Sequence, residues 1–182
     1  MLFAAYIQEL REIYKTYDVS WDIARRCAES SLREAETVLG FSLERGLRDA
    51  WQIADGSGFR LFARPGFLTG YDFLSLTSAL NERDNMRLVA PQYEGYVEEI
   101  LRDQRIRHGW FHEGWLPFAG FGGGILRLIQ DYCPSGVGNI GQIIAFTHDP
   151  DEISYVTPDF QTFLDRSLSW IKEGPEEFLE IF

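Results

Sequence analysis

Apolar side chains recur along much of the chain at a spacing typical of helices. Over residues 2–17 they fall at steps of three and four, at Phe3, Tyr6, Leu10, Ile13 and Tyr17. That spacing places them on one face of an amphipathic helix, with the charged residues mostly turned to solvent. Similar patterns predict further helices over residues 20–26, 31–39, 43–54, 77–89, 93–108 and 157–173.

Two of these helices carry signals for where they begin and end. Ser31 and Glu34 match the capping box, in which two side chains satisfy free backbone amides at a helix start. Gly40 predicts the end of that helix, because glycine tolerates the left-handed conformation found there. Residues 157–159, Thr-Pro-Asp, supply a capping hydroxyl, a proline for the first turn and an acid that faces the helix dipole.

Strand-like runs occupy the middle of the chain. Short runs bounded by turn residues predict strands over 59–63, 70–76 and 153–156. The stretch from Trp115 to Phe146 contains a short apolar segment, a triple glycine and two further apolar runs, 125–131 and 142–146. We therefore expect an α+β fold in which a central, mostly antiparallel sheet is wrapped by helices.

The length of 182 residues fits one compact domain spanning 1–182. Within it, residues 1–30 or so are expected to form a helical N-terminal extension, and the polar segment 77–114 is a candidate insertion. A hydrophobic content of 45% and an aromatic content of 15% exclude a disordered chain.

The chain is strongly acidic, since 17 Lys and Arg against 28 Asp and Glu give a net charge of −11 at pH 7. This charge repels nucleic acid and anionic membranes and favours a basic partner, although acidity also serves solubility alone. Cys27 and Cys133 show no paired spacing, so both are expected to be reduced. With no secretory signal and no apolar run near the ~20 residues of a membrane helix, we expect a cytoplasmic location.

The triple glycine, Gly122–Gly124, is the first candidate for chemistry, because glycine-rich loops can cradle phosphate. A phosphate loop needs a helix after it and usually a lysine, whereas a strand-like run follows here. The glycines therefore predict a turn that admits close backbone approach, and no cofactor is expected.

Metal and catalytic sites have little support in the sequence. His108 and His112 are four residues apart, but Gly109 interrupts the helix that this spacing requires. His148 would have to join them through the fold to complete a metal site. Neither cysteine has a neighbouring histidine, and no Gly-x-Ser-x-Gly motif occurs. We therefore expect no metal ligand and no catalytic residue.

Aromatic residues gather on either side of residues 112–114. Trp115 lies in an apolar run and is expected in the core. The sequence does not decide between two roles for Trp110 and Phe111, core packing and anchoring a protein interface, because aromatic side chains serve in both.

A set of short motifs occurs in order from about Glu34 to Trp170. It comprises Glu36, Leu39–Gly40, Leu43, Leu47–Arg48, Asp55–Gly56, Trp115–Ala119, Gly123–Gly124, Asp131, Gly141–Ile144, Phe160, Phe163 and Leu164. This ordered set resembles the SUKH superfamily, which includes fungal cell-wall-assembly regulators of the Smi/Knr type and many bacterial relatives.

The resemblance implies helices wrapped around a central sheet and a non-enzymatic, protein-binding role. Bacterial relatives are immunity proteins that neutralise toxins, so we expect a protein partner, such as a basic nuclease toxin, and neither nucleic acid nor membrane. The residues expected to contact this partner are Asp55, Trp110, Phe111, Trp115, Asp131 and His148.

Three other functions stay open on the sequence alone. One is a regulatory scaffold of the cell-wall-assembly type, and another is binding of a small ligand near the stretch 115–146. The third is a metal-dependent hydrolase assembled from His108, His112, Asp131 and His148.

Overall fold

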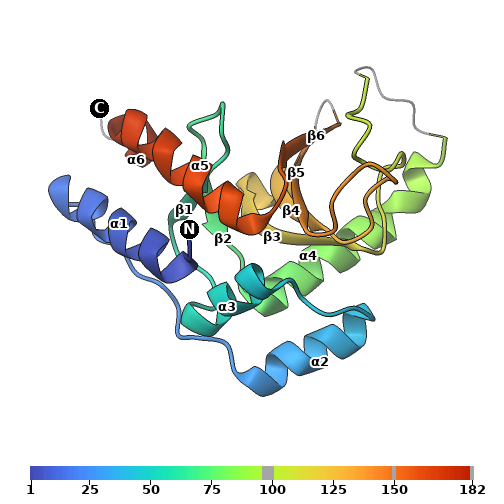
Figure 1. Ribbon diagram of the computed structural model, residues 1–182, viewed down its shortest axis with the longest axis horizontal. Helices are drawn as coiled ribbons and strands as arrows, with labels where there is room; N and C mark the ends of the chain where they lie inside the picture. The colour runs from blue at the N-terminus through green and yellow to red at the C-terminus, as the bar shows by residue number, and fades with distance from the viewer. Residues whose placement is uncertain (96–100, 149–150, 181–182) are drawn as a thin grey trace.

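A computed structural model of the chain describes residues 1–95, 101–148 and 151–180, and it contains one open six-stranded sheet (Figure 1). The strands follow sequence order, and each pairs antiparallel with the next. They are β1 (Arg60–Ala63), β2 (Gly70–Phe73), β3 (Trp115–Phe121), β4 (Leu126–Asp131), β5 (Gln142–Thr147) and β6 (Glu152–Thr157). The expected α+β class with a central antiparallel sheet is therefore confirmed.

Helices pack on both sides of this sheet. They are α1 (Phe3–Thr16), α2 (Glu29–Leu39), α3 (Arg45–Ile53), α4 (Leu76–Val89), α5 (Phe160–Glu173) and α6 (Pro175–Leu179), with short 3₁₀ turns η1 (Ala90–Tyr93) and η2 (Gly122–Gly124). The helix α5 contacts α1, α3 and the sheet, whereas α4 packs along β3. Among the residues described, no helix combines the length and apolar character needed to cross a membrane.

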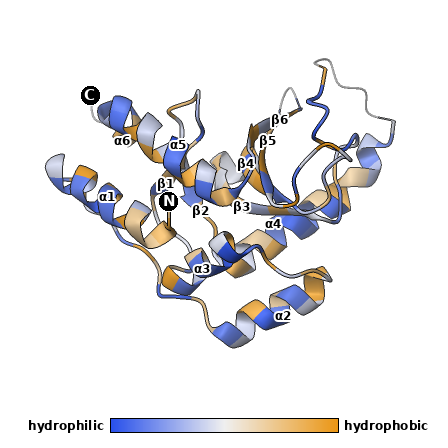
Figure 2. Ribbon diagram, in the orientation of Figure 1, coloured by the Kyte–Doolittle hydropathy of each residue, from blue (hydrophilic) through white to orange (hydrophobic). Residues whose placement is uncertain are grey.

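The central strands are buried on both faces, so apolar residues occur on both sides of each strand. On β4, Leu128 belongs to the larger core cluster beneath α1, α3 and α5, and Ile129 belongs to a second cluster on the opposite face. On β5, Ile143 and Ile144 divide in the same way. Figure 2 shows hydrophobic and hydrophilic colours alternating along α2, as expected for a helix that buries one face.

Aromatic rings fill the larger cluster. Phe62 packs against Phe118 and Phe163 with ring centroids 5.8 and 5.5 Å apart. Burying one such ring contributes roughly 1.5–3 kcal/mol, so this group stabilises the contact between α5 and the sheet.

The helix predicted over residues 20–26 is wrong. This segment is extended, and its backbone bonds to the turn after α3, with Ala24 N–H donating to the Gly56 carbonyl over 3.1 Å. In return, Asp55 N–H donates to the Arg25 carbonyl over 3.1 Å. Because a distant segment satisfies these groups, local capping by Ser20 does not decide the structure.

The capping box predicted at Ser31 is also wrong, because α2 begins two residues earlier, at Glu29, and its start has no side-chain cap. Gly40 does end this helix in the left-handed conformation, with φ of 76°. At the last long helix the cap is Asp159, whose carboxylate accepts from Thr162 N–H at 2.6 Å. Pro158 therefore precedes α5 and does not form part of its first turn.

The helix predicted over 93–108 falls partly on residues 96–100, which lie outside the described residues, as do residues 149–150. Residues 101–108 are described and are not helical. Arg102 donates to the carbonyls of Arg107 and Gly109 at 2.6 and 2.7 Å, so a side chain replaces helical bonds in this loop. The division into a domain with an extension and an insertion stays a prediction.

Candidate functional site

A trough runs between α4 and the sheet, on the face opposite α5. It consists of two adjoining chambers of about 200 and 230 Å³. Both are lined by Gly123, Gly124 and Arg127, so the triple-glycine turn lies where they meet. The β2-side chamber also contains Asp72, Leu74 and Phe121, and the β5-side chamber contains Trp110, Phe146 and His148.

An ion pair separates the two chambers. Arg127 of β4 points toward α4, where its Nε donates to Glu82 Oε2 over 3.0 Å. Both side chains are largely buried, with 14% and 27% of their surfaces exposed. The Arg127 guanidinium also lies 5.3 Å from the centre of the Phe146 ring, within the range of a cation–π contact. The charge in the middle of the trough is therefore fixed in position.

The triple glycine forms a tight turn, as the sequence predicts. All three residues have positive φ, at 64°, 66° and 94°. A Cβ on Gly124 would lie 2.4 Å from Arg127 Nη2, whereas a Cβ on Gly123 would meet no atom within 4 Å. Glycine is thus needed at position 124 for two reasons, its backbone conformation and the ion pair packed against it.

The β5-side chamber has an aromatic wall that is held by hydrogen bonds. Trp110 stacks on Tyr93 with centroids 4.4 Å apart and meets Phe146 edge-on at 5.3 Å. Its Nε1 donates to Asp151 Oδ2 at 2.7 Å, and the other Asp151 oxygen lies 2.6 Å from Nδ1 of His148. Asp151 therefore orients both the tryptophan and the histidine of this chamber.

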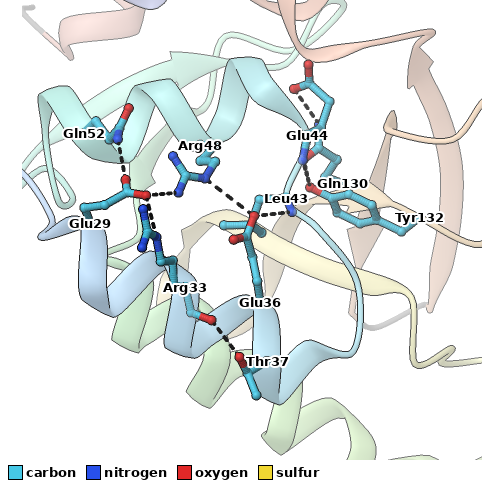
Figure 3. Close-up of polar contacts among 10 residues, drawn as sticks. All are labelled: Glu29, Arg33, Glu36, Thr37, Leu43, Glu44, Arg48, Gln52, Gln130 and Tyr132. Carbon is cyan, nitrogen blue, oxygen red and sulfur yellow. Dashed lines mark hydrogen bonds and ion pairs between the residues drawn. The ribbon is translucent and has the colours of Figure 1, made fainter.

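On the other face of the sheet, a polar network joins α2, α3 and β4 (Figure 3). Arg48 lies between two carboxylates of α2, at 2.7 Å from Glu29 and 3.5 Å from Glu36, and Glu36 also accepts from Leu43 N–H. Hydrogen bonds from Arg48, and then Arg33, hold the pKa of the Glu29 carboxyl below its ordinary value. These contacts fix the connection from α2 to α3.

The same network continues into the sheet through Tyr132. Its hydroxyl accepts from Glu44 N–H at 2.8 Å and donates to Gln130 Oε1 at 2.6 Å, and its ring stacks on Phe41. Burial raises the pKa of Tyr132, so the hydroxyl stays protonated and continues to donate. Several of the ordered motif residues thus serve a structural purpose here.

The whole sheet, α4 and the polar network fall within a single family match. Residues 26–166 match the model of the SMI1 / KNR4 family (SUKH-1). The chain belongs to this family. No curated protein sequence matches it. The resemblance inferred from the ordered motifs is confirmed, and membership supports a protein-interaction or immunity-type module, in a family whose members are generally non-enzymatic.

Only some of the residues predicted to contact a partner lie near the trough of this SMI1 / KNR4-family chain. Trp110 and His148 line the β5-side chamber, and His148 is exposed. Phe111 is partly buried against the second cluster. Asp55 accepts from Leu76 N–H at 2.7 Å, which helps to fix the start of α4. The role of these four residues as partner contacts stays a prediction.

Trp115 and Asp131 are fully buried and face each other across β3 and β4. The Asp131 carboxylate accepts from Cys133 N–H and from the Gln142 side chain, each at 2.9 Å. Burial raises its pKa, with the two hydrogen bonds opposing that shift. Neither residue presents surface to a partner in this conformation, because both side chains are enclosed within the fold. Their role as partner contacts stays a prediction.

The residues proposed for a metal site are not brought together. In the described ranges, no group of three or more His, Cys, Asp and Glu is placed to hold a metal ion. His112 Nε2 instead lies 2.7 Å from the His108 carbonyl oxygen. Both cysteines are free thiols, as predicted.

Sequence reasoning missed the charged residues of the trough, Asp72, Glu82 and Arg127. A signal was present for one of them, because Arg127 is a charged residue between the apolar Leu126 and Leu128. Its partner Glu82 is 45 residues away along the chain, on a helix whose pattern is weakly amphipathic. Only the packing of α4 on the sheet brings the pair together.

Proposed function

We propose that this protein is a bacterial immunity protein that binds a cognate toxin through the trough and blocks the toxin's active surface. The proposal includes a cytoplasmic location and involves no catalysis, cofactor or metal. Family membership supports the general role of protein binding. The trough supports the position of the binding surface.

The observation that carries the proposal is an exposed apolar rim at the triple-glycine turn. Phe121 and Ile125 flank the turn, with 39% and 51% of their surfaces exposed, and each lines one chamber. Large apolar side chains beside a concave surface are typical anchors of protein interfaces, because a partner that covers them removes apolar area from water. The rim is held on a tight turn, so little ordering is needed on binding.

The charge of the chain supports a basic partner. A net charge of −11 attracts a positively charged protein over the distance at which the two first meet. Such steering raises the association rate more than it lowers the dissociation rate, and it weakens as salt screens the charges. Many toxins of this kind are nucleases, whose substrate-binding surfaces are basic.

A titration of the purified protein against the toxin encoded beside its gene tests the proposal. We expect binding at micromolar concentration or tighter, with an association rate that falls as salt rises. Absence of binding at micromolar concentration, or binding that strengthens with salt, would contradict it. Capture of a wall-synthesis enzyme from the native host, with no toxin gene nearby, would instead support a regulatory scaffold.

A pair of matched variants locates the surface. Ile125→Asp places a charge at the mouth of the trough, whereas Ile140→Asp makes the same change in the loop before β5. Ile140 is 76% exposed and lines neither chamber. Burying an unpaired carboxylate costs several kcal/mol, so Ile125→Asp should weaken toxin binding at least tenfold. Equal affinities for the two variants would move the interface away from the trough.

A further inference from the structure

Asp72 is a carboxylate without a partner in the β2-side chamber. It lies on β2 between Tyr71 and Phe73, whose rings enter the larger core, so its own side chain points to the opposite face, into the trough. Within the ranges that the structure describes, its carboxylate makes no hydrogen bond or ion pair. Partial burial raises its pKa, which reflects the loss of water around a charge that nothing nearby fully compensates.

The nearest cations are engaged elsewhere. Arg60 is opposite Asp72 on β1, but its guanidinium donates to the Phe178 carbonyl at 2.9 Å and pairs with Glu180. Arg127 pairs with Glu82, as described above. Two carboxylates therefore line this cavity of about 200 Å³ against one guanidinium, and Asp72 has the charge of Arg60 nearby but no hydrogen bond to it.

The walls of the chamber suit a long cationic side chain. Leu74 and the Cα of Gly120 offer apolar surface for an aliphatic stem, and Gly120 has no side chain to fill the space. Phe121 is partly exposed and lies at the edge of the chamber, where it adds apolar surface to the entrance. Arginine fits this combination better than lysine, because its planar guanidinium donates two parallel hydrogen bonds to one carboxylate.

We propose that the β2-side chamber is the pocket for one arginine side chain of the protein partner, bound by Asp72 through its guanidinium. The inference rests on the proposed function and adds the chemistry of the anchoring residue. The partner's guanidinium takes the place of the water that burial removes from Asp72. The aliphatic stem of the same arginine lies along Leu74.

A small probe tests the pocket without the partner. N-acetyl-arginine methylamide is titrated into ¹⁵N-labelled protein, and the amide signals of residues 120–124 are followed. We expect saturable shifts at millimolar concentration, and none with the citrulline analogue, which has the same shape and no charge. Shifts that do not saturate, or that citrulline reproduces, would overturn the proposal.

Matched variants assign the binding to Asp72. Asp72→Asn should weaken binding of the probe roughly three- to tenfold, because a charged hydrogen-bond acceptor becomes neutral. Asp22→Asn makes the same change of charge at an exposed position outside the trough and should leave binding unchanged. Since Asp72 is unpaired, its replacement should not lower the melting temperature, which separates lost binding from lost folding. Equal binding by wild type and Asp72→Asn would refute the assignment.

The two proposals fail in distinguishable ways. If the toxin binds wild type and Asp72→Asn equally, the trough or another face still binds the toxin, but no arginine uses this chamber. If no toxin binds and the arginine probe still saturates with dependence on Asp72, the pocket stands and the immunity function fails.

Discussion

The ion pair behind the triple-glycine turn gives a sharp test of how the trough is built. Gly124→Ala introduces two separate costs. The first is the left-handed backbone at φ 94°, which costs an alanine about 1–2 kcal/mol. The second is the contact of the new Cβ, 2.4 Å from Arg127 Nη2, which forces the guanidinium away from Glu82. Loss of this largely buried pair adds about 1–2 kcal/mol.

Gly123→Ala is the matched control, because it carries the backbone cost alone. Its φ is 66°, and a Cβ there meets no atom within 4 Å. We therefore expect urea unfolding to give a loss of about 1–2 kcal/mol for Gly123→Ala and about 2–4 kcal/mol for Gly124→Ala. In a protein of this size the difference between the two variants corresponds to roughly 2–8 °C in melting temperature.

A double variant isolates the cause of the difference. In an Arg127→Ala background the guanidinium is absent, so the extra cost of Gly124→Ala over Gly123→Ala should fall by about 1–2 kcal/mol. If the extra cost of Gly124→Ala persists there, the contact with Arg127 does not explain it. If the two glycine variants are equally stable in the wild-type background, the ion pair adjusts at no cost and the reasoning is wrong.

Three further outcomes are expected from buried polar groups. Tyr6→Phe should lower the unfolding free energy by about 1–2 kcal/mol, since the hydroxyl bonds the Leu61 carbonyl at 2.7 Å, whereas Tyr17→Phe should change it little. Burial raises the pKa of Cys133 to about 11, so in a Cys27→Ala variant its alkylation at pH 8 should be roughly a hundredfold slower than that of an exposed thiol, rising only near pH 11. Because the pKa of Asp131 is raised in the folded protein, the protonated carboxyl contributes stability below its ordinary pKa of 3.8, and this contribution is lost as the pH rises through the raised value. In Asp131→Asn, the unfolding free energy measured in urea should therefore vary less with pH over that window. A pH profile equal to that of the wild type would refute this.

Much of the fold follows from periodicity in the sequence. The apolar spacing predicts α1 and α5 closely, because each buries one face against a large core and the pattern records that burial. The two strands β4 and β5 are also found, since burial on both faces places apolar residues at neighbouring positions in each strand.

The errors occur where distant groups decide local structure. α2 begins at Glu29, where Arg48 and Gln52 of α3 bond its carboxylate, and the capping signal at Ser31 carries no information about those contacts. The extended segment 20–26 depends in the same way on the turn after α3. A local pattern cannot predict a boundary that is stabilised from another part of the chain.

The trough could not be predicted from the sequence for a related reason. The same reason separates the residues that hold the fold from those that decide binding specificity. Glu36, Arg48 and other ordered motif residues belong to the network on the α3 side of the sheet, where they hold the framework together. Asp72 and the exposed rim lie on the opposite face, on a strand and a turn outside that network. The two faces can therefore vary independently, because each strand residue points to only one of them. A sequence that keeps the framework residues keeps the fold, while changes at Asp72, Phe121 or Ile125 are expected to alter which partner fits the proposed site.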